Sequence, residues 1–433
     1  MSEVLIRGGT VVDEGGERRA DVLVSGCDIV AVAERIEAPS GARVLEGGGC
    51  LVAPGLVDLH THLRQPGGEV AETVESGCRA AALGGYSAVV AMPNTEPAID
   101  DRSVVRDVLE LGRHALAQVA VAGAITIGRR GERLSPMGEL AALGVRLFTD
   151  DGSGVQDASV MRQALEYAGD LGVVLAEHCE DASLAAGGHM HEGAWSSRLG
   201  LPGQPALAEE AMLARDLALV RLTRTPMHFL HLSTAGSVEL VARAKAEGLP
   251  VTAEVTPHHL LLTDAEVASY DPVFKVNPPL RGEADVEAVR RGLVEGVIDA
   301  VATDHAPHPP ETKERPFEEA PPGMLGLETA LAVAFGALSG RLGAVGLLGA
   351  FSWRPARIAG LDRASGGRQG GPVGPGAPAN LVVFDPAAEW EVDPAALSSR
   401  SRNTPYRGRR LRGRVRHTLR EGEPVVVDGT AQR

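Results

Sequence analysis

The middle of this chain alternates eight short apolar runs of β type with stretches of helical periodicity. The runs end near Leu59, Met92, Thr126, Thr149, Glu177, Leu232, Val255 and Thr303. Between them the periodicity predicts helices, among them 73–83, 159–169, 206–222, 237–247 and 284–295. Eight strand–helix units predict an α/β fold, a (β/α)8 barrel of the TIM type over residues 55–360. The alternative is an open doubly wound sheet, but no G-x-G-x-x-G sequence opens the first unit.

The two ends of the chain differ from this middle part. Residues 1–54 contain short β-type runs separated by glycine turns. Residues 361–433 show the same pattern of β-type runs after a Gly- and Pro-rich stretch at 366–378. We therefore predict that the N-terminal and C-terminal segments meet and form one small β-sandwich domain beside the barrel.

Composition narrows the range of partners. The formal net charge of −15 argues against nucleic acid as a partner, because no basic face could dominate such a surface. No apolar stretch is long enough to span a bilayer, and the N-terminus does not resemble a signal peptide. The four cysteines form no C-x-x-C pair and suit a reducing compartment. We expect a cytoplasmic protein that binds a small molecule.

Residues able to bind a metal follow the predicted strands. His60 and His62 end the first strand, and side chains two apart in an extended strand face the same side. Further residues of this kind lie at the ends of later strands: Asp150, Asp151, His178, His231 and Asp304. The carboxyl ends of barrel strands meet at one mouth, so these side chains should converge. Such a set suffices for two metal ions that share a carboxylate, whereas a lone buried histidine is usually a core residue.

With these motifs the chain resembles the amidohydrolase superfamily, and within it the class I (bacterial-type) dihydroorotases. The resemblance covers essentially the whole chain. It rests on PGLVDLHTHLR at 54–64, MPNT at 92–95, TDDG at 149–152, EHCE at 177–180, TPHH at 256–259, KVNPPLR at 275–281 and ATDHAPH at 302–308. The last two are specific motifs, while the His-x-His pair alone would indicate only the superfamily.

The resemblance implies two zinc ions and a role for each ligand. His60, His62 and Asp304 would hold one zinc, and His178 and His231 the other, with Asp151 between them. Asp304 would also act as the general base and then the general acid.

Many relatives bridge their metals with a carboxylated lysine on the fourth strand. This chain has no lysine before Lys245, so it cannot form that bridge between its first and fifth strands. The class I pattern has an aspartate there, and Asp151 matches it. Asp150 beside it stays an alternative, because the sequence does not say which carboxylate turns inward.

The resemblance also implies the reaction, which interconverts N-carbamoyl-L-aspartate and (S)-dihydroorotate in pyrimidine biosynthesis. Substrate contacts would come from His62, Arg64, Asn94, Asn277, His308 and the backbone around Pro322 and Gly323. A guanidinium with amide donors suits the substrate carboxylate. The alternative for Arg64 is a surface ion pair with Glu69 or Glu72. The Pro-rich segment 305–325 follows the last strand, and we expect it to shape the substrate pocket and to close over it.

Two rival functions remain at this point. The first is another cyclic amide hydrolase, such as an allantoinase or hydantoinase, against which the missing lysine, Arg64 and Asn277 argue. The second is a non-catalytic or partner-dependent companion of aspartate transcarbamoylase. Non-catalytic companions typically lose metal ligands, and here all six positions are filled. Association with that enzyme is also open to an active chain, and homodimers are common in the family.

Overall fold

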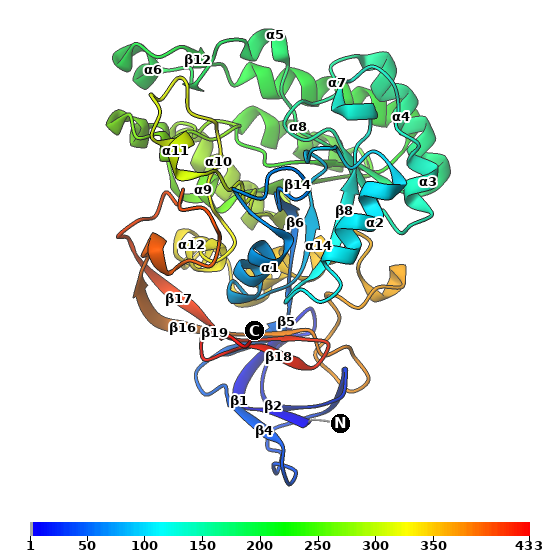
Figure 1. Ribbon diagram of the computed structural model, residues 1–433, viewed down its shortest axis with the longest axis vertical. Helices are drawn as coiled ribbons and strands as arrows, with labels where there is room; N and C mark the ends of the chain where they lie inside the picture. Colours follow the sequence, from blue (N-terminus) through cyan, green and yellow to red (C-terminus); the bar gives the residue numbers. More distant parts are fainter. Residues whose placement is uncertain (1–2) are drawn as a thin grey trace.

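A ring of eight parallel strands forms the centre of the computed structural model, which describes residues 3–433 (Figure 1). In sheet order, which is also chain order, they are β6 (Leu56–Thr61), β7 (Tyr86–Ala91), β8 (Gln118–Gly123), β9 (Leu147–Thr149), β10 (Val174–Glu177), β13 (Met227–Phe229), β14 (Val251–Val255) and β15 (Ala300–Val301). A parallel bridge joins Thr61 of β6 to His305, beyond β15. The ring is therefore nearly closed, and the predicted barrel is confirmed.

Helices surround the ring (Figure 1). They are α1 (Val74–Leu83), α2 (Arg102–Leu111), α3 (Met137–Ala141), α4 (Ala158–Leu171), α7 (Leu207–Thr223), α8 (Ala235–Ala246), α10 (Glu283–Val294), α12 (Ala330–Ala337), α13 (Ala344–Phe351) and α14 (Trp353–Ile358). The five helices predicted from periodicity all form, with ends shifted by one or two residues. A capping box fixes the start of α1: the Thr73 hydroxyl accepts from the Ser76 N–H, and the Ser76 hydroxyl accepts from the Thr73 N–H. No helix within residues 3–433 is long and apolar enough to cross a membrane.

Other short elements lie in the loops that follow the strands. They are α5 (Ala182–Ala185), β11 (Met190–His191), α6 (Ala194–Leu199), β12 (Gly203–Gln204), α9 (Pro257–Leu261) and α11 (Pro310–Lys313). The last of these lies inside the Pro-rich segment 305–325.

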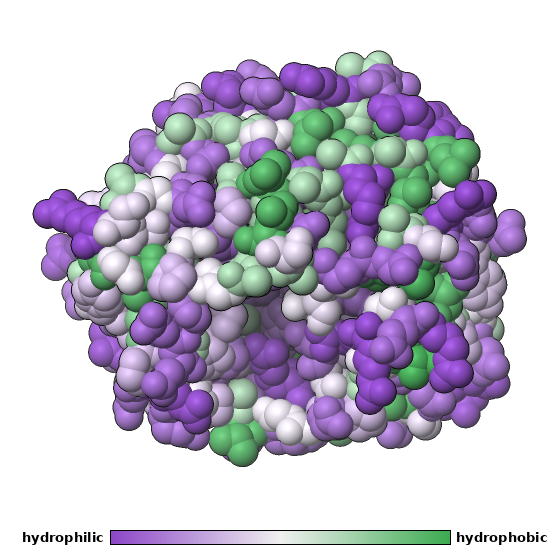
Figure 2. All heavy atoms as spheres, turned by 90° about the horizontal axis from the view of Figure 1, so that it is seen from above, coloured by the Kyte–Doolittle hydropathy of each residue, from purple (hydrophilic) through white to green (hydrophobic). Residues whose placement is uncertain are grey.

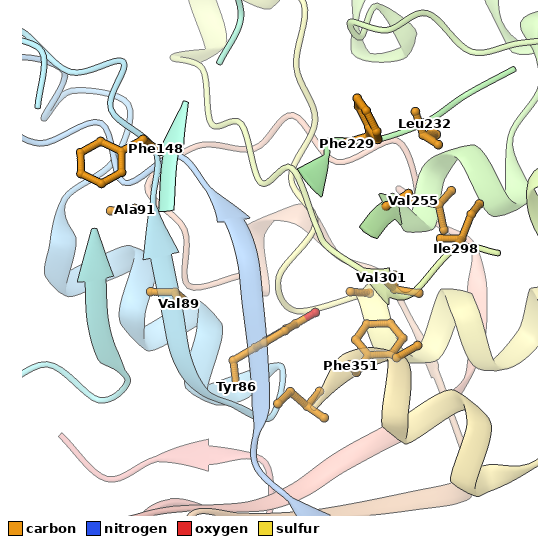
Figure 3. Packing of buried hydrophobic residues seen from close by; sticks show 14 of the residues in the cluster. Tyr86, Val89, Ala91, Phe148, Phe229, Leu232, Val255, Ile298, Val301 and Phe351 are labelled. Atoms are coloured by element: carbon orange, nitrogen blue, oxygen red, sulfur yellow. The ribbon is translucent and has the colours of Figure 1, made fainter. Parts of the chain in front are cut away.

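The barrel core is largely apolar on both faces of its strands, with buried exceptions such as Asp58, His228 and Glu254. Figure 3 shows part of the main cluster, in which Phe148, Phe229 and Phe351 are fully buried. Parallel strands covered by helices on one face and barrel interior on the other have no solvent side, which explains why they read as continuous apolar runs. Polar residues appear where these strands end, and the site is built there.

The two ends of the chain share a single sheet. Its nine strands are β1 (Glu3–Asp13), β2 (Gly16–Ser25), β3 (Asp28–Ala33), β4 (Arg43–Glu46), β5 (Leu51–Pro54), β16 (Leu381–Glu391), β17 (Arg410–Arg420), β18 (Glu423–Val427) and β19 (Thr430–Ala431). β5 pairs with β1 on one side and with β16 on the other, so Pro54 lies opposite Leu381. The two terminal segments meet as expected, with hydrogen bonds linking all nine strands.

Three strands, β8, β13 and β15, end two or three residues earlier than the sequence predicts. β13 ends two residues before His231, and β15 ends three residues before Asp304. Both residues have positive φ, 29° for His231 and 45° for Asp304, so the chain has left the extended conformation there. Buried Asp58 contributes to this bend because its carboxylate accepts hydrogen bonds from the Thr303 backbone at 2.8 Å and hydroxyl at 2.6 Å.

Glu328, just before α12, gives the fold a pH dependence. Burial raises its pKa to about 7, although the Ser398 N–H donates to its Oε1 over 2.7 Å. A carboxyl with a raised folded pKa stabilises fully below its unfolded pKa of about 4.3, and this contribution is lost as pH rises through 7. We therefore expect Glu328→Gln to raise the free energy of unfolding at pH 8 by about 1–2 kcal/mol, with little change at pH 4.5.

Urea unfolding of both proteins between pH 4.5 and 8 measures this effect, with Glu37→Gln on the exposed surface as the control. A difference between Glu328→Gln and the parent chain that stays constant with pH would contradict the interpretation.

Candidate metal centre

All six predicted ligand side chains converge at the carboxyl ends of the barrel strands. None is more than 5% exposed: His60, His62, Asp151, His178, His231 and Asp304. Donor atoms of five of them form two groups of three that could each hold a metal ion. The first is His60, His62 and Asp151, and the second is Asp151, His178 and His231. Because Asp151 belongs to both groups, it lies where a carboxylate shared by two ions would lie.

Distances within the cluster are short. His60 Nε2 lies 3.3 Å from Asp151 Oδ1, and His62 Nε2 lies 3.5 Å from Asp151 Oδ2. His62 Nε2 is also 2.9 Å from Asp304 Oδ1. On the other side, His178 Nδ1 and His231 Nε2 each lie 3.7 Å from Asp151 Oδ1. Asp304 therefore extends the first group, beside the two histidines of β6 and its end.

Asp150 and Asp151 turn in opposite directions. The Asp150 Oδ1 atom accepts hydrogen bonds from the backbone of Ile125 at 2.9 Å and of Thr126 at 3.0 Å. The Thr126 hydroxyl bonds its second oxygen. Asp150 is thus occupied in joining the end of β9 to the segment after β8, and Asp151 alone of the two faces the histidines.

The donor set fits a divalent metal ion. His60 Nε2 is buried and has no hydrogen-bond partner, although it points at two carboxylates. His178 Nδ1 and His231 Nε2 face each other at 2.9 Å. Two ring nitrogens directed at each other beside a shared carboxylate are ligands of the kind that zinc prefers.

The electrostatics keep both aspartates ionised. Burial alone would raise their pKa values, but the surrounding histidines hold the pKa of Asp151 and of Asp304 below the usual range. His60 contributes most to this lowering at both carboxylates. Both groups are therefore available as anionic ligands or as proton acceptors.

Each of the two histidines of the first group is oriented by a hydrogen bond at its second ring nitrogen, Nδ1. His62 Nδ1 lies 2.8 Å from Asn94 Oδ1, so a proton on Nδ1 leaves Nε2 free to face the aspartates. His60 Nδ1 lies 3.0 Å from Glu254 Oε1 in the same way. Glu254 Oε2 lies 3.0 Å from His228 Nε2, and both side chains are fully buried. The sequence analysis missed Glu254 and His228, and the only signal was a charged residue inside the buried run of β14.

Glu254 should therefore control metal affinity. Its carboxylate accepts from two histidines, which hold its pKa at about 2 despite the opposing effect of burial. In Glu254→Gln the single amide oxygen can accept from only one of the two rings, so the paired hydrogen bonds that orient His60 and His228 cannot both be kept. We expect the affinity for a divalent metal ion to fall about 10–100-fold, as measured with added zinc in competition with a chelator. Glu247→Gln on the surface is the control, and an unchanged affinity in Glu254→Gln would contradict this role.

The predicted substrate residues line a pocket beside the cluster. Its lining includes Arg64, Asn94, Asn277, His308, Pro322 and Gly323. The face that is uppermost in Figure 1 is hollowed, with hydrophilic side chains around the hollow (Figure 2). Asn277 Oδ1 is buried without a hydrogen-bond partner, while its Nδ2 lies 3.4 Å from His178 Nε2. The pocket thus offers an unused acceptor close to the histidine cluster.

Arg64 belongs to this pocket and not to a surface ion pair. Its backbone φ is 60°, its Nε donates to Pro307 O over 3.2 Å, and its Nη2 lies 3.5 Å from His308 Nε2. No ion pair joins it to Glu69 or Glu72 in the described chain. Burial, with the nearby guanidinium, lowers the pKa of His308 to about 3, so this ring is neutral. The guanidinium therefore keeps its charge available for an anion.

A nearly closed (β/α)8 barrel with a buried His–Asp cluster at its mouth defines a hydrolase barrel of the amidohydrolase type. Solved structures share the fold. An L-hydantoinase from Arthrobacter aurescens matches with a TM-score of 0.89 at 24% identity, covering 100% of this chain and 98% of that one. A dihydropyrimidinase from Brevibacillus agri matches with a TM-score of 0.86 at 22% identity, over 99% and 96% of the two chains.

Sequence comparison gives the family. Residues 49–237 match the dihydro-orotase-like family model. A dihydroorotase from Streptomyces coelicolor is 50% identical over 99% of both chains, and one from Anaeromyxobacter dehalogenans is 48% identical over 100% of both. The chain belongs to the dihydroorotase family, whose members are enzymes that act on cyclic amides.

Proposed function

We propose that this chain is a zinc-dependent dihydroorotase that interconverts N-carbamoyl-L-aspartate and (S)-dihydroorotate, with two zinc ions per chain. The observation that carries the proposal is the position of Asp151 between two groups of buried histidines. Full-length relatives at 46–50% identity that are named dihydroorotase support the choice of substrate. The hydantoinases share only the fold.

In this proposal the ligands divide into two sets. One zinc is held by His60, His62 and Asp304, the other by His178 and His231, and Asp151 is shared. When bound there, zinc supplies a Lewis acid for the ring carbonyl and lowers the pKa of water. The absence of any lysine before Lys245 supports an aspartate as the shared ligand.

Asp304 transfers a proton between water and the ring nitrogen of the substrate. In the hydrolytic direction, its ionised carboxylate accepts a proton from water as the water oxygen bonds to the ring carbonyl carbon. It then donates that proton to the ring nitrogen as the amide C–N bond breaks. In the biosynthetic direction the ureido nitrogen attacks the carboxyl carbon, and water leaves. The positive φ of Asp304 supports this role because strained backbone concentrates at functional residues.

Substrate recognition uses the opposite side of the pocket. The Arg64 guanidinium pairs with the substrate carboxylate, assisted by the Asn94 amide and the neutral His308 ring. Asn277 offers its buried Oδ1 to a ring N–H. The backbone around Pro322 and Gly323 forms the adjoining wall. A hydantoin has no carboxylate that would need Arg64, so these residues favour dihydroorotate.

A substrate panel tests the proposal. The purified chain supplied with zinc should hydrolyse dihydroorotate and neither hydantoin nor allantoin. Comparable turnover of hydantoin or allantoin would replace the proposal with its closest rival. If no substrate is hydrolysed although zinc is bound, addition of aspartate transcarbamoylase tests the partner-dependent alternative.

The oligomeric state of the chain and its association with another enzyme remain predictions. We expect a homodimer, which size-exclusion chromatography with light scattering would measure. Association with aspartate transcarbamoylase would be detected by co-purification.

A further inference from the structure

The segment 305–325 forms one wall of the pocket. Its residues Ala306, His308, Pro321, Pro322 and Gly323 line it. Gly323 has a φ of 142°, and a Cβ there would lie 2.8 Å from His308 Nε2 and 2.9 Å from Ala306 Cβ. Only glycine fits this close approach, so a small backbone shift at Gly323 would change the wall that the substrate meets.

Lys275 reaches into this segment from outside it. Its ammonium donates to the backbone oxygens of Phe317 and Glu318, each over 2.9 Å. The side chain is only 7% exposed, and the ammonium lies 5.7 Å from the centre of the Phe317 ring. No carboxylate in the described residues pairs with it. The buried ammonium of Lys275 is therefore hydrogen-bonded to backbone carbonyls of the segment, and not to an acidic side chain.

Lys313 makes the reciprocal contact. From α11, inside the segment, its ammonium donates to Pro272 O over 3.0 Å and to Lys275 O over 3.2 Å. The Gly323 N–H donates to the same Lys275 oxygen over 2.9 Å. The Lys275 carbonyl thus accepts from both Lys313 and Gly323, and it lies two residues before Asn277.

We propose that Lys275 and Lys313, here called the lysine clasp, are positioning residues that fix the Pro322–Gly323 wall for substrate binding. The inference rests on the proposed function, because it takes that wall to contact dihydroorotate. Lys275 bonds carbonyls of the segment 305–325, and Lys313 bonds carbonyls at Pro272 and Lys275. Loss of either lysine therefore releases the part of the segment around α11. It also makes the Lys275 carbonyl, which accepts from the Gly323 N–H, less firmly fixed.

Residue type supports this role. Only three of the chain's 42 Lys and Arg residues are lysines, and two of them form the clasp. An ammonium offers three rotatable donors to carbonyls from different directions, whereas a guanidinium presents a planar fork. Burial lowers the pKa of both clasp lysines, that of Lys313 to about 7. A neutral amine still carries N–H donors, so the contacts persist in either charge state.

Lys313→Met and Lys275→Met test the clasp, with Lys245→Met as the matched control. Lys245, on α8, is the third lysine and bonds Gly296 and Asp299 in the segment between α10 and β15. We expect each clasp variant to raise KM for dihydroorotate about tenfold while kcat changes less than about threefold. The zinc content should equal that of the control, and a glutamate-specific protease should cleave at 311–319 faster.

The combined variant gives a further test. Both lysines join the same two segments, 272–275 and 313–318, so the double variant should raise KM by less than the product of the single effects. An unchanged KM in Lys313→Met overturns the proposal, and so does a KM increase that is matched by zinc loss. If Lys275→Met does not fold, Lys313→Met alone decides, because Lys313 is only half-buried, at the end of the short helix α11.

Failure of the proposed function is distinguishable from failure of the clasp. If the parent chain and Lys245→Met do not turn over dihydroorotate, the proposed function has failed. The protease measurement still applies in that case, and equal cleavage rates in all variants would overturn the clasp independently.

Discussion

Replacing Asp304 by asparagine is expected to lower kcat for dihydroorotate at least about 10³-fold. Asparagine keeps the shape of the side chain but cannot accept and return a proton, and general acid–base catalysis is worth about 10²–10⁴-fold. The neighbouring histidines hold the pKa of Asp304 well below its usual value despite burial. The group therefore enters the reaction as a base, and its loss removes about 4 kcal/mol of transition-state stabilisation.

Steady-state kinetics with metal analysis of the same samples measures this effect, since Asp304 is also a proposed zinc ligand. Asp107→Asn, on the exposed face of α2, is the control. If Asp304→Asn kept more than about a tenth of the parent kcat at full zinc occupancy, the proton-transfer role would be wrong.

Asp151→Asn is expected to lower bound zinc from two ions per chain to one or none, with kcat reduced by at least about 10³-fold. A neutral amide is a poor shared ligand, and the histidines on both sides would lose the carboxylate between them. Metal analysis after dialysis gives the stoichiometry, and the activity assay gives kcat.

Asp150→Asn is the matched comparison, one residue away. An amide has a single acceptor oxygen, so part of the bonding of Asp150 to Ile125, Thr126 and its hydroxyl would be lost. We expect a loss of about 1–3 kcal/mol in the free energy of unfolding with zinc content retained. The reverse result, zinc lost in Asp150→Asn and kept in Asp151→Asn, would contradict the account.

The sequence was informative where periodicity decides the structure. Alternation in an extended strand correctly directed His60 and His62 to one side, and the end of β6 is where the sequence predicts it. Helical periodicity gave α1, α4, α7, α8 and α10 to within two residues. In both cases the local pattern and the burial demanded by the fold agree, so tertiary structure did not override the prediction.

The sequence predicts strand ends and side-chain direction less well where the backbone leaves regular structure. His231 and Asp304 lie beyond their strands at positive φ, and no sequence pattern marks such a residue unless it is glycine. The choice between Asp150 and Asp151 depends on a turn whose direction is set by hydrogen bonds to Ile125 and Thr126, far away in sequence.

Residues that act through others were missed for a different reason. Glu254 and His228 form one buried unit, yet they lie on different strands, and each alone reads as an ordinary strand residue. Lys275 belongs to the KVNPPLR motif, but its hydrogen bonds and those of Lys313 to backbone carbonyls of the facing segment leave no pattern in the sequence. Such supporting contacts become visible only when the fold brings distant segments together.

Removal and return of the metal tests the central claim most directly. The chain is stripped with a chelator, the loss of metal is confirmed by elemental analysis, and dihydroorotate hydrolysis is measured as zinc is added back. We predict that hydrolysis falls at least about 100-fold without metal and recovers as two zinc ions bind per chain. Full turnover by the metal-free protein would contradict the account.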